Sequence, residues 1–270
     1  MKLISVFFLR VPCVLCGEGQ LGKMITTFKI FRFDSKKDEE PYEQEFRVEL
    51  GDSEKVTVLD ALFRIQQTQD ETLSFRYSCR LAMCGSCALV INGKEGLACK
   101  TLVKDLGHGP VSLKPLSHIP IIKDLTVDLK ALINRLKKME PYFVPKKESP
   151  EPAKIKPTSK ERQTIGLNTE CIACGSCVSA CTMMHWDPEY IGPMGLNRAF
   201  CLIVDSRNLG GKRLEQVADE NGVFRCHTEF NCTDVCPKHI SPTRGIHYLK
   251  RRIFWQGMKN LNPFRRGKSE

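Results

Sequence analysis

The chain has 270 residues, of which 41% are hydrophobic and 27% charged, and its formal net charge is +10. This length allows one large domain or two small ones, and no stretch approaches the apolar length of a membrane span, so the sequence predicts no membrane-crossing helix. Most of the 14 cysteines fall into short, regularly spaced motifs, which indicates a reducing compartment and argues against a disulfide-stapled secreted protein.

Residues 1–23 are expected to be a dispensable extension, with Met24 as an alternative start. Residues 3–9 are apolar like the core of a signal peptide, but Arg10 interrupts them and no small-residue cleavage site follows. Cys13 and Cys16 form a C-x2-C pair without a partner pair, so we interpret them as incidental thiols.

Residues 24–120 are predicted to form an α+β domain. Alternating or continuous apolar residues predict short strands at 25–33, 46–50, 88–91 and 111–113. Apolar residues at helical spacing over 58–65 predict one helix that packs on the sheet. Asn92-Gly93 is a strong signal for a two-residue hairpin turn.

Four cysteines of this domain have the C-x4-C-x2-C…C spacing of plant-type [2Fe–2S] centres. They are Cys79, Cys84, Cys87 and Cys99. The small residues Gly85, Ser86 and Ala88 allow backbone N–H groups to approach the sulfides, which tunes the reduction potential. The alternative to a cluster is a redox-active disulfide, but a disulfide would use only two of these four cysteines and would not explain the spacing of the other two.

Residues 121–162 are predicted to connect two domains. Leu125, Leu129, Leu132 and Leu136 recur at helical spacing and predict an amphipathic helix. Prolines then recur among lysines and glutamates over 141–162, which is typical of a semi-rigid, solvated linker.

Residues 163–255 are predicted to be a helical domain with a cysteine run at each end. The first run has the C-x2-C-x2-C-x3-C spacing of a cubane cluster, and the second ends in Cys-Pro. The two runs contain Cys171, Cys174, Cys177, Cys181, Cys226, Cys232 and Cys236. In two-cluster ferredoxins the fourth cysteine of a run serves the other cluster. This rule predicts a [4Fe–4S] centre on Cys171, Cys174, Cys177 and Cys236.

Cys181, Cys226 and Cys232 remain for the last centre, which we therefore expect to be [3Fe–4S]. Glu229 occupies the position at which a complete run carries its missing cysteine. Three roles for Glu229 are open: relaying protons or tuning the potential beside a vacant iron corner, ligating iron through its carboxylate, or being a solvated bystander. Structural zinc sites usually pair two C-x2-C hairpins, which the triple run does not match, and disulfides are a further alternative.

The sequence contains no dinucleotide-binding fingerprint, no P-loop and no Ser/His/Asp arrangement placed by a motif. Three centres without such a site predict a one-electron relay, in which another protein supplies the electrons, usually as pairs from a flavin. The basic residues lie mainly in the linker and in a tail at 256–270. Two alternatives are open for this tail: it contacts anionic lipid or a membrane partner, or it is solvated. A protein that binds single-stranded nucleic acid needs a groove in which basic residues alternate with aromatic residues that stack on the bases. The basic residues of this chain lie in a linker and a tail instead, so no nucleic acid is expected as a partner.

The cysteine motifs and their neighbours together resemble one family. The matching stretches are 78–87, 171–174, 225–228, 231–233 and 236–238, with 188–193 and 204–207 between the two runs. They resemble the iron–sulfur subunit of succinate dehydrogenase and fumarate reductase, over about residues 25–255. The resemblance implies an N-terminal β-grasp domain like plant ferredoxin and a C-terminal all-α domain like bacterial ferredoxin.

The resemblance also implies partners and a location. The partners would be a flavoprotein subunit carrying FAD and the dicarboxylate site, and a cytochrome b-type membrane anchor that binds quinone. The chain would lie peripherally on the cytoplasmic face of the cell membrane, or on the matrix face of the mitochondrial inner membrane. The alternative is a relay subunit of another flavin-linked oxidoreductase.

Two residues of the quinone pocket are implied by the same resemblance, His227 and Trp186. The simpler alternatives are that His227 is a hydrogen-bonding neighbour of the cluster and that Trp186 is a buried aromatic residue. The chain departs from the family at Thr182, where proline is usual, at His185, where tryptophan is common, and at Glu229, where a small or aliphatic residue is usual.

Overall fold

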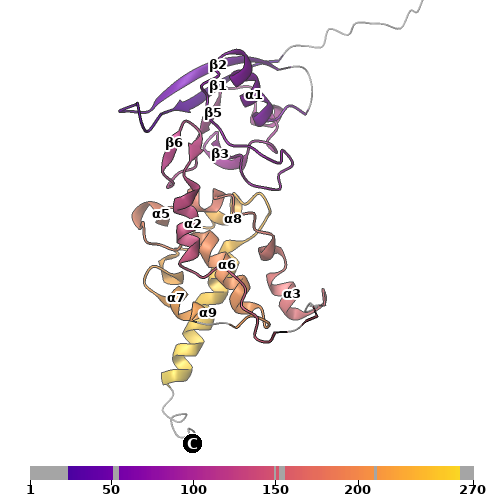
Figure 1. The fold of residues 1–270 in the computed structure, drawn as a ribbon, viewed down its shortest axis with the longest axis vertical. Coiled ribbons are helices and arrows are strands. Elements are labelled where there is room, and N and C mark those ends of the chain that lie inside the picture. Colours follow the sequence, from indigo (N-terminus) through magenta and orange to yellow (C-terminus); the bar gives the residue numbers. More distant parts are fainter. Residues whose placement is uncertain (1–23, 51–54, 149, 152–155, 210–211, 262–270) are drawn as a thin grey trace, which may run out of the picture.

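The computed structural model describes residues 24–50, 55–148, 150–151, 156–209 and 212–261. The expectations for residues 1–23 and for most of the tail lie outside these residues. Two units follow one another along the long axis, a sheet-bearing unit and then a helical unit, as the sequence predicts (Figure 1). Among the described residues, no helix is both long and apolar enough to cross a membrane.

The first unit contains a five-stranded mixed sheet with the order β2-β1-β5-β3-β4. Its elements are β1 (Met24–Arg32), β2 (Tyr42–Leu50), α1 (Val58–Thr68), β3 (Ala88–Ile91), β4 (Lys94–Leu97), the 3-10 turn η1 (Val103–Leu106) and β5 (Val111–Lys114). β1 pairs antiparallel with β2 and parallel with β5, while β3 pairs antiparallel with both β5 and β4. This is the β-grasp arrangement that the sequence predicts, with α1 packed on the sheet (Figure 1).

Local sequence explains these elements. In β2 Phe46, Val48 and Leu50 are buried and the charged residues between them are exposed, as the alternation predicts. Helix α1 begins at a capping box in which Thr57 accepts from the backbone N–H of Asp60 and Asp60 accepts from the backbone N–H of Thr57. Asn92 and Gly93 both have positive φ, 48° and 81°, as a two-residue turn of the favoured twist requires.

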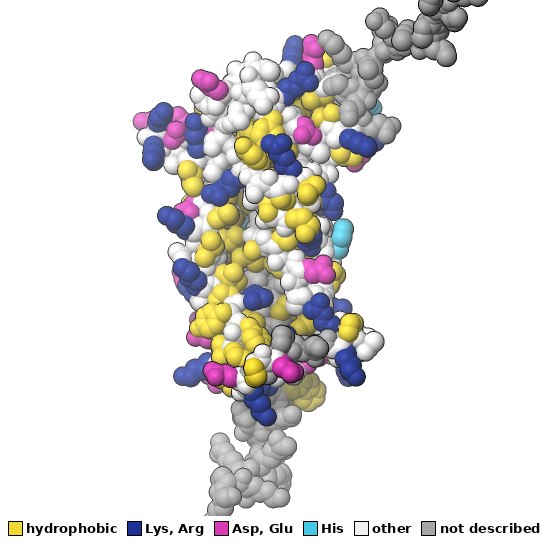
Figure 2. Space-filling model, turned by 45° about the vertical axis from the view of Figure 1, so that its right-hand side comes forward, with side chains coloured by type: hydrophobic (Ala, Val, Ile, Leu, Met, Phe, Trp, Pro, Cys, Tyr) yellow, Lys and Arg dark blue, Asp and Glu magenta, His cyan; other side chains and the backbone are white. Residues whose placement is uncertain are grey.

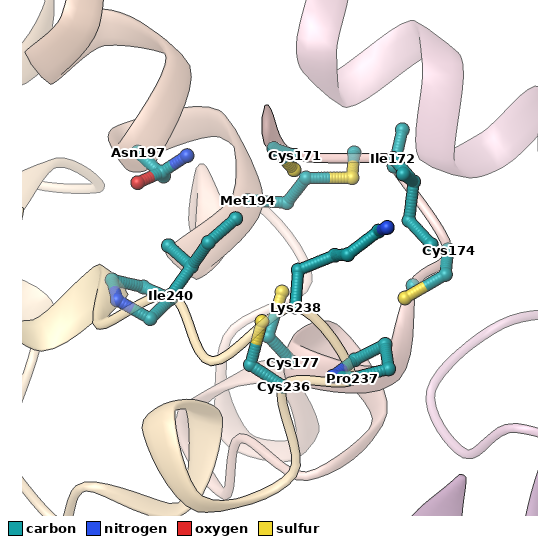
Figure 3. Close-up of a pocket in the computed structure, with 13 residues that line it drawn as sticks. Cys171, Ile172, Cys174, Cys177, Met194, Asn197, Cys236, Pro237, Lys238 and Ile240 are labelled. Atoms are coloured by element: carbon teal, nitrogen blue, oxygen red, sulfur yellow. The ribbon is translucent and has the colours of Figure 1, made fainter. Parts of the chain in front are cut away.

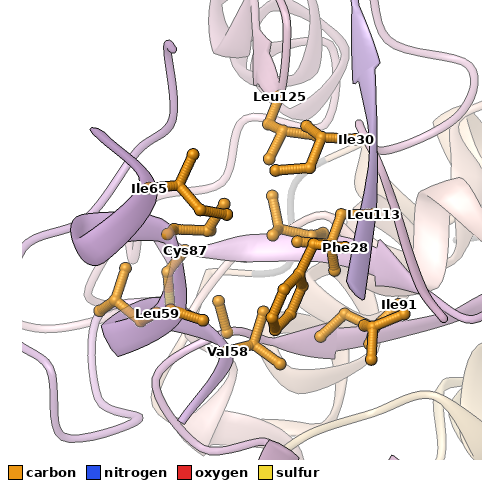
Figure 4. Close-up of a cluster of buried hydrophobic side chains, with 14 of the residues drawn as sticks. Phe28, Ile30, Val58, Leu59, Ile65, Cys87, Ile91, Leu113 and Leu125 are labelled. Atoms are coloured by element: carbon orange, nitrogen blue, oxygen red, sulfur yellow. The ribbon is translucent and has the colours of Figure 1, made fainter. Parts of the chain in front are cut away.

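The core of the first unit lies between α1 and the sheet (Figure 4). Phe28, Ile30 and Leu113 of the sheet meet Leu59 and Ile65 of α1, and all are almost completely buried. Burying such side chains stabilises the fold by about 1.5–3 kcal/mol each. The same core fixes the position of the loop at 77–87 that carries three of the predicted metal ligands.

The segment before α2 (Leu129–Lys137) corrects one prediction. The sequence predicts a helix from Leu125, but β6 (Ile121–Lys123) and β7 (Thr126–Val127) form a two-stranded sheet there, and Leu125 lies in the turn between them. Leu125 is buried in the first core, beyond residue 120 where the sequence ends the domain. Helix α2 begins only after Asp128, whose side chain accepts from the backbone N–H of Lys130.

Part of the predicted linker is hydrogen-bonded to the helical unit, although most of its side chains are exposed. The backbone N–H of Val144 donates to Oδ1 of Asn208 at 2.9 Å, and its carbonyl accepts from the N–H of Leu209 at 2.8 Å. Arg198 donates from Nε to the carbonyl of Pro141 at 2.8 Å. The residues at 142, 143, 145 and 146 are exposed, and the buried side chain of Asn208 finds a backbone partner in this segment.

The second unit is helical. Its elements are α3 (Lys160–Ile165), η2 (Leu167–Glu170), α4 (Ser176–Ser179), α5 (Met183–Trp186), α6 (Gly192–Val204), α7 (Arg213–Ala218), η3 (Val223–Arg225), α8 (Asn231–Asp234) and α9 (Pro242–Leu261). Helix α6 lies at the centre and packs along α9, with Phe200 directly against Gly245. α9 continues as a helix past residue 255, where the sequence predicts that a separate tail follows.

One face of the molecule is rich in apolar side chains. Figure 2 shows hydrophobic side chains running down the middle of this face, with basic side chains mainly along its edges. Over the described residues as a whole, the exposed large hydrophobic side chains include Leu81, Met83, Trp186, Phe230 and Trp255. Surfaces of this kind usually contact a partner.

Candidate functional site

The loop at 77–87 arranges backbone N–H groups around the first four cysteines. Leu81, Met83 and Cys84 donate from their backbone N–H groups to Sγ of Cys79 at 3.3–3.4 Å. Ala82 donates in the same way to Sγ of Cys99 at 3.3 Å, so the fourth cysteine, which arrives from after β4, faces the same loop. Donors of this kind stabilise the negative charge of thiolates and sulfides.

The thiols of this loop lie in different environments. Hydrogen bonds from the hydroxyl and backbone of Ser86 and from the backbone near Cys79 lower the pKa of Cys84 to about 6. Burial raises the pKa of Cys87 to about 12, and nearby Cys99 and Cys84 contribute to this rise. Cys87 belongs to the buried core (Figure 4), where a thiolate is stable only beside a compensating charge such as a metal ion or cluster, and where the thiol otherwise stays protonated. This donor set fits a [2Fe–2S] cluster.

Four cysteines of the helical unit line one pocket. Cys171, Cys174, Cys177 and Cys236 surround it, together with Met194 and Pro237 (Figure 3). The turn between the first cysteines requires positive φ at Ala173 (52°) and Gly175 (87°), which brings the thiols to one side. Burial raises the pKa of Cys177 well above its usual value, and the other three thiols of the pocket and Cys232 add to this effect.

Cys181, Cys226 and Cys232 line a second pocket. The structure therefore groups the seven cysteines of the two runs in the reciprocal way that the spacing predicts. Burial raises the pKa of Cys181 to about 11. Cys232 lies 3.3 Å from the hydroxyl of Thr243, a contact from α9 that no motif in the sequence signals. All of these cysteines are free thiols, so none of them forms a disulfide.

Both donor sets of the helical unit fit iron–sulfur clusters. Each pocket presents at least three thiols to one space. No carboxylate or histidine lines the pocket of Cys171, whereas His227 and Glu229 line the pocket of Cys181 beside its three thiols. The assignment of individual cysteines to individual clusters stays a prediction.

Glu229 lies at the rim of the second pocket and is hydrogen-bonded. The hydroxyl of Thr182 donates to its Oε2 at 2.6 Å, and Nδ2 of Asn231 donates to the same oxygen at 3.4 Å. Two of the three positions at which the chain departs from the family pattern, 182 and 229, are therefore in direct contact. Sequence reasoning marks both positions but does not join them.

His227 also lines the second pocket, whereas Trp186 does not. Trp186 is 75% exposed, so the alternative that it is a buried aromatic residue is wrong. Its ring lies edge-on against that of His185, at 5.1 Å between centroids, and His185 lies 5.8 Å from the ring of His118 in the first unit. The structure thus brings together His227 and Glu229 and leaves Trp186 on the neighbouring surface.

Comparison with protein families identifies two domains. Residues 27–134 match the model described as a 2Fe-2S iron-sulfur cluster binding domain. Residues 168–240 match the model described as a 4Fe-4S dicluster domain. These ranges contain all of the predicted cysteine ligands.

Several characterised proteins are similar over most of this chain. The mitochondrial succinate dehydrogenase [ubiquinone] iron-sulfur subunit 1 of Oryza sativa subsp. japonica is 39% identical over 237 residues, covering 86% of this chain and 84% of the relative. The succinate dehydrogenase iron-sulfur subunit of Coxiella burnetii is 36% identical over 229 residues, covering 84% and 96%. A chain of the Mycobacterium smegmatis Sdh1 complex has a similar structure, with a TM-score of 0.79 and 25% identity, covering 88% of this chain and 98% of that chain.

Proposed function

The chain belongs to the family of succinate dehydrogenase iron–sulfur subunits and is an electron-transfer subunit of that oxidoreductase. We propose that it carries electrons from the flavin of a partner subunit through three clusters to a quinone. The observation that carries this proposal is the order of three cysteine sites in one chain. The first unit provides one site, and the helical unit provides two pockets that are both lined in part by α6 and α9.

The clusters supply reversible one-electron chemistry, and the residues of this chain hold and tune them. The N–H donors of the loop at 77–87 stabilise the reduced state of the first centre, because added negative charge strengthens these hydrogen bonds. The pocket lined by Cys171 has the apolar residues Ile172, Met194 and Ile240 in its walls, which limit the access of water to the second centre. Water exclusion and hydrogen bonding are two means by which a protein sets cluster potentials.

We assign a [3Fe–4S] centre to the pocket of Cys181, Cys226 and Cys232. It offers three thiols and a glutamate whose Oε2 already accepts hydrogen bonds from Thr182 and Asn231. These bonds favour Glu229 as a neighbour of a vacant iron corner over Glu229 as an iron ligand. A carboxylate there lowers the potential of the centre and can exchange a proton with a bound quinone.

A quinone site beside this pocket is the second part of the proposal. His227 and Glu229 form its polar rim, and both are exposed. A quinone that accepts two electrons also takes up two protons, so groups that donate or relay protons are needed at its oxygens. Trp186 would contribute a wall of the same site from the neighbouring surface.

The proposed partners are a flavoprotein that carries FAD and a cytochrome b-type membrane anchor. The exposed apolar residues Leu81 and Met83 lie on the loop of the first centre, where electrons from a flavin would enter. Trp186 and Phe230 are exposed near the three-cysteine pocket, where electrons would leave toward a quinone in the membrane. The chain would be held peripherally on the cytoplasmic or matrix face.

Purification of the native complex through a tag on this chain tests the function. We expect an FAD-containing subunit and a quinone-binding membrane subunit to co-purify, and succinate to reduce clusters only in the assembled complex. Succinate oxidation by the isolated chain would contradict the proposal, because no substrate site for a dicarboxylate is assigned here.

His227→Ala tests the quinone site. Quinone reduction should fall while succinate-to-dye activity, with a dye that accepts electrons before the quinone, is retained. Trp186→Ala should have the same effect, and the exposed Phe224→Ala, which changes an aromatic residue outside the pocket lining, is the control. Equal loss of both activities would mean that His227 only supports the cluster or the fold.

A further inference from the structure

The cysteine loops of the two units come into contact at Gly85 and Cys174. A Cβ atom placed on Gly85 would lie 2.6 Å from Cβ and 2.9 Å from Cα of Cys174, distances that real Cβ atoms essentially never show. The contacted atoms are the backbone and the first side-chain atom of Cys174. Rotation of a flexible side chain therefore cannot relieve the contact, and only glycine lets the two loops approach this closely.

The backbone angle of Gly85 does not by itself explain why a glycine is needed. Its φ is +74°, but Arg80 and Ala82 of the same loop also have positive φ, 58° and 55°. The loop thus accommodates side chains at positive φ where there is space for them. Space is what position 85 lacks.

Neighbouring contacts hold the two loops together. Ile172 and Cys174 pack against the hydrophobic core of the first unit. Lys100 donates from Nζ to the carbonyl of Pro237 at 3.4 Å, and Lys238 lies 3.8 Å from the sulfur of Met83. The approach of Gly85 to Cys174 is therefore part of a built interface between the loop of the first centre and the pocket of the second.

We propose that Gly85 is a positioning residue that sets the gap between the [2Fe–2S] and [4Fe–4S] centres. One electron, supplied by the flavin of the partner, leaves the reduced [2Fe–2S] centre and enters the oxidised [4Fe–4S] centre, with no bond made or broken. Because electron tunnelling weakens exponentially with distance, any side chain at position 85 slows this step. The inference rests on the relay function proposed above.

Gly85→Ala in the assembled complex tests the role. Cys174 must retreat from 2.6 Å to the 3.4 Å of an ordinary contact, that is by about 0.8 Å. We expect both centres to assemble, their mutual magnetic interaction in EPR to weaken when both are reduced, and re-oxidation of [2Fe–2S] to become slower. The EPR measurement uses a chemical reductant and needs neither succinate nor quinone, so its outcome is independent of the proposed substrates.

Two glycines of the same unit provide matched controls. Gly93 and Gly107 have φ of +81° and +83°, but a Cβ on either would meet nothing within 4 Å. Gly93→Ala and Gly107→Ala therefore impose the backbone strain of a positive φ without the contact, and the magnetic interaction should stay as in the unmodified chain.

Three outcomes would overturn the proposal. The first is an unchanged interaction in Gly85→Ala with both signals present. The second is an equal change in all three variants, which would assign the effect to strain. The third is failure of Gly85→Ala alone to assemble the [2Fe–2S] centre, which would place the role of the glycine within its own loop. The first outcome overturns the role of Gly85 even where quinone reduction is lost.

Discussion

Replacing Asp124 with asparagine should destabilise the first unit by about 3 kcal/mol, because it breaks a buried ion pair. The carboxylate of Asp124 is 2% exposed and accepts from Nε of Arg32 at 2.9 Å. It also accepts from the backbone N–H groups of Phe33 at 3.2 Å and Ser74 at 2.9 Å. Loss of one partner of a buried pair costs about 3–5 kcal/mol, and the low end applies because Asp70 still pairs with Arg32.

Asparagine is the informative substitution because it tolerates the positive φ of Asp124, 48°, better than most residues. Urea unfolding followed by the visible circular dichroism of the [2Fe–2S] centre should show a midpoint lower by about 2 M, given a slope of about 1–2 kcal/mol per M. Glu45→Gln, which breaks the exposed pair with Lys29 at 3.0 Å, is the control and should cost at most about 1 kcal/mol. Equal shifts in the two variants would refute the role of the buried pair.

Three further predictions concern the clusters and the dependence on pH. Cys236→Ser should disturb the EPR signal of the four-iron centre lined by the earlier cysteine run, and loss of only the three-iron signal would show that the reciprocal assignment is wrong. Glu229→Ile should retain the near-isotropic signal of an oxidised three-iron centre and raise its midpoint potential in a redox titration, whereas an unchanged potential and unchanged quinone kinetics would make Glu229 a bystander. Burial opposes ionisation of Asp70, but hydrogen bonds from Thr72 and Arg32 lower its pKa from 3.8 to about 2. The contribution of Asp70 to stability is therefore complete above about pH 4 and is lost as the pH falls from about 4 to 2. The free energy of unfolding of Asp70→Asn should therefore depend less on pH in that range. The same pH dependence in the variant and in the unmodified chain would contradict this.

Short-range signals in the sequence were sufficient for most of the secondary structure. The alternation in β2, the capping box of α1 and the Asn92-Gly93 turn each depend on residues within a few positions of one another. The cysteine spacings likewise predict the kinds of centre, because a cluster of given size requires ligands at given separations along a turn. Both domains that the spacings indicate match family models.

The errors lie where a distant residue overrides a local pattern. Leu125 has helical spacing with the leucines that follow it, but Asp124 pairs with Arg32 on β1 and holds Leu125 in the core of the first unit. The composition of 141–146 likewise gives no sign that the buried side chain of Asn208 binds this largely exposed segment. Propensity and composition contain no information about such partners.

The sequence by itself determined the class of protein, because metal-ligand spacing and local periodicity are properties of neighbouring residues. Only the tertiary structure decided which residues share a site. It joined Thr182 to Glu229, left Trp186 on the surface and placed Gly85 against Cys174. The Thr182–Glu229 contact lies within the helical unit, and the Gly85–Cys174 contact joins the two units. In both cases the residues are far apart in the chain, and such a contact leaves no periodic trace in the sequence.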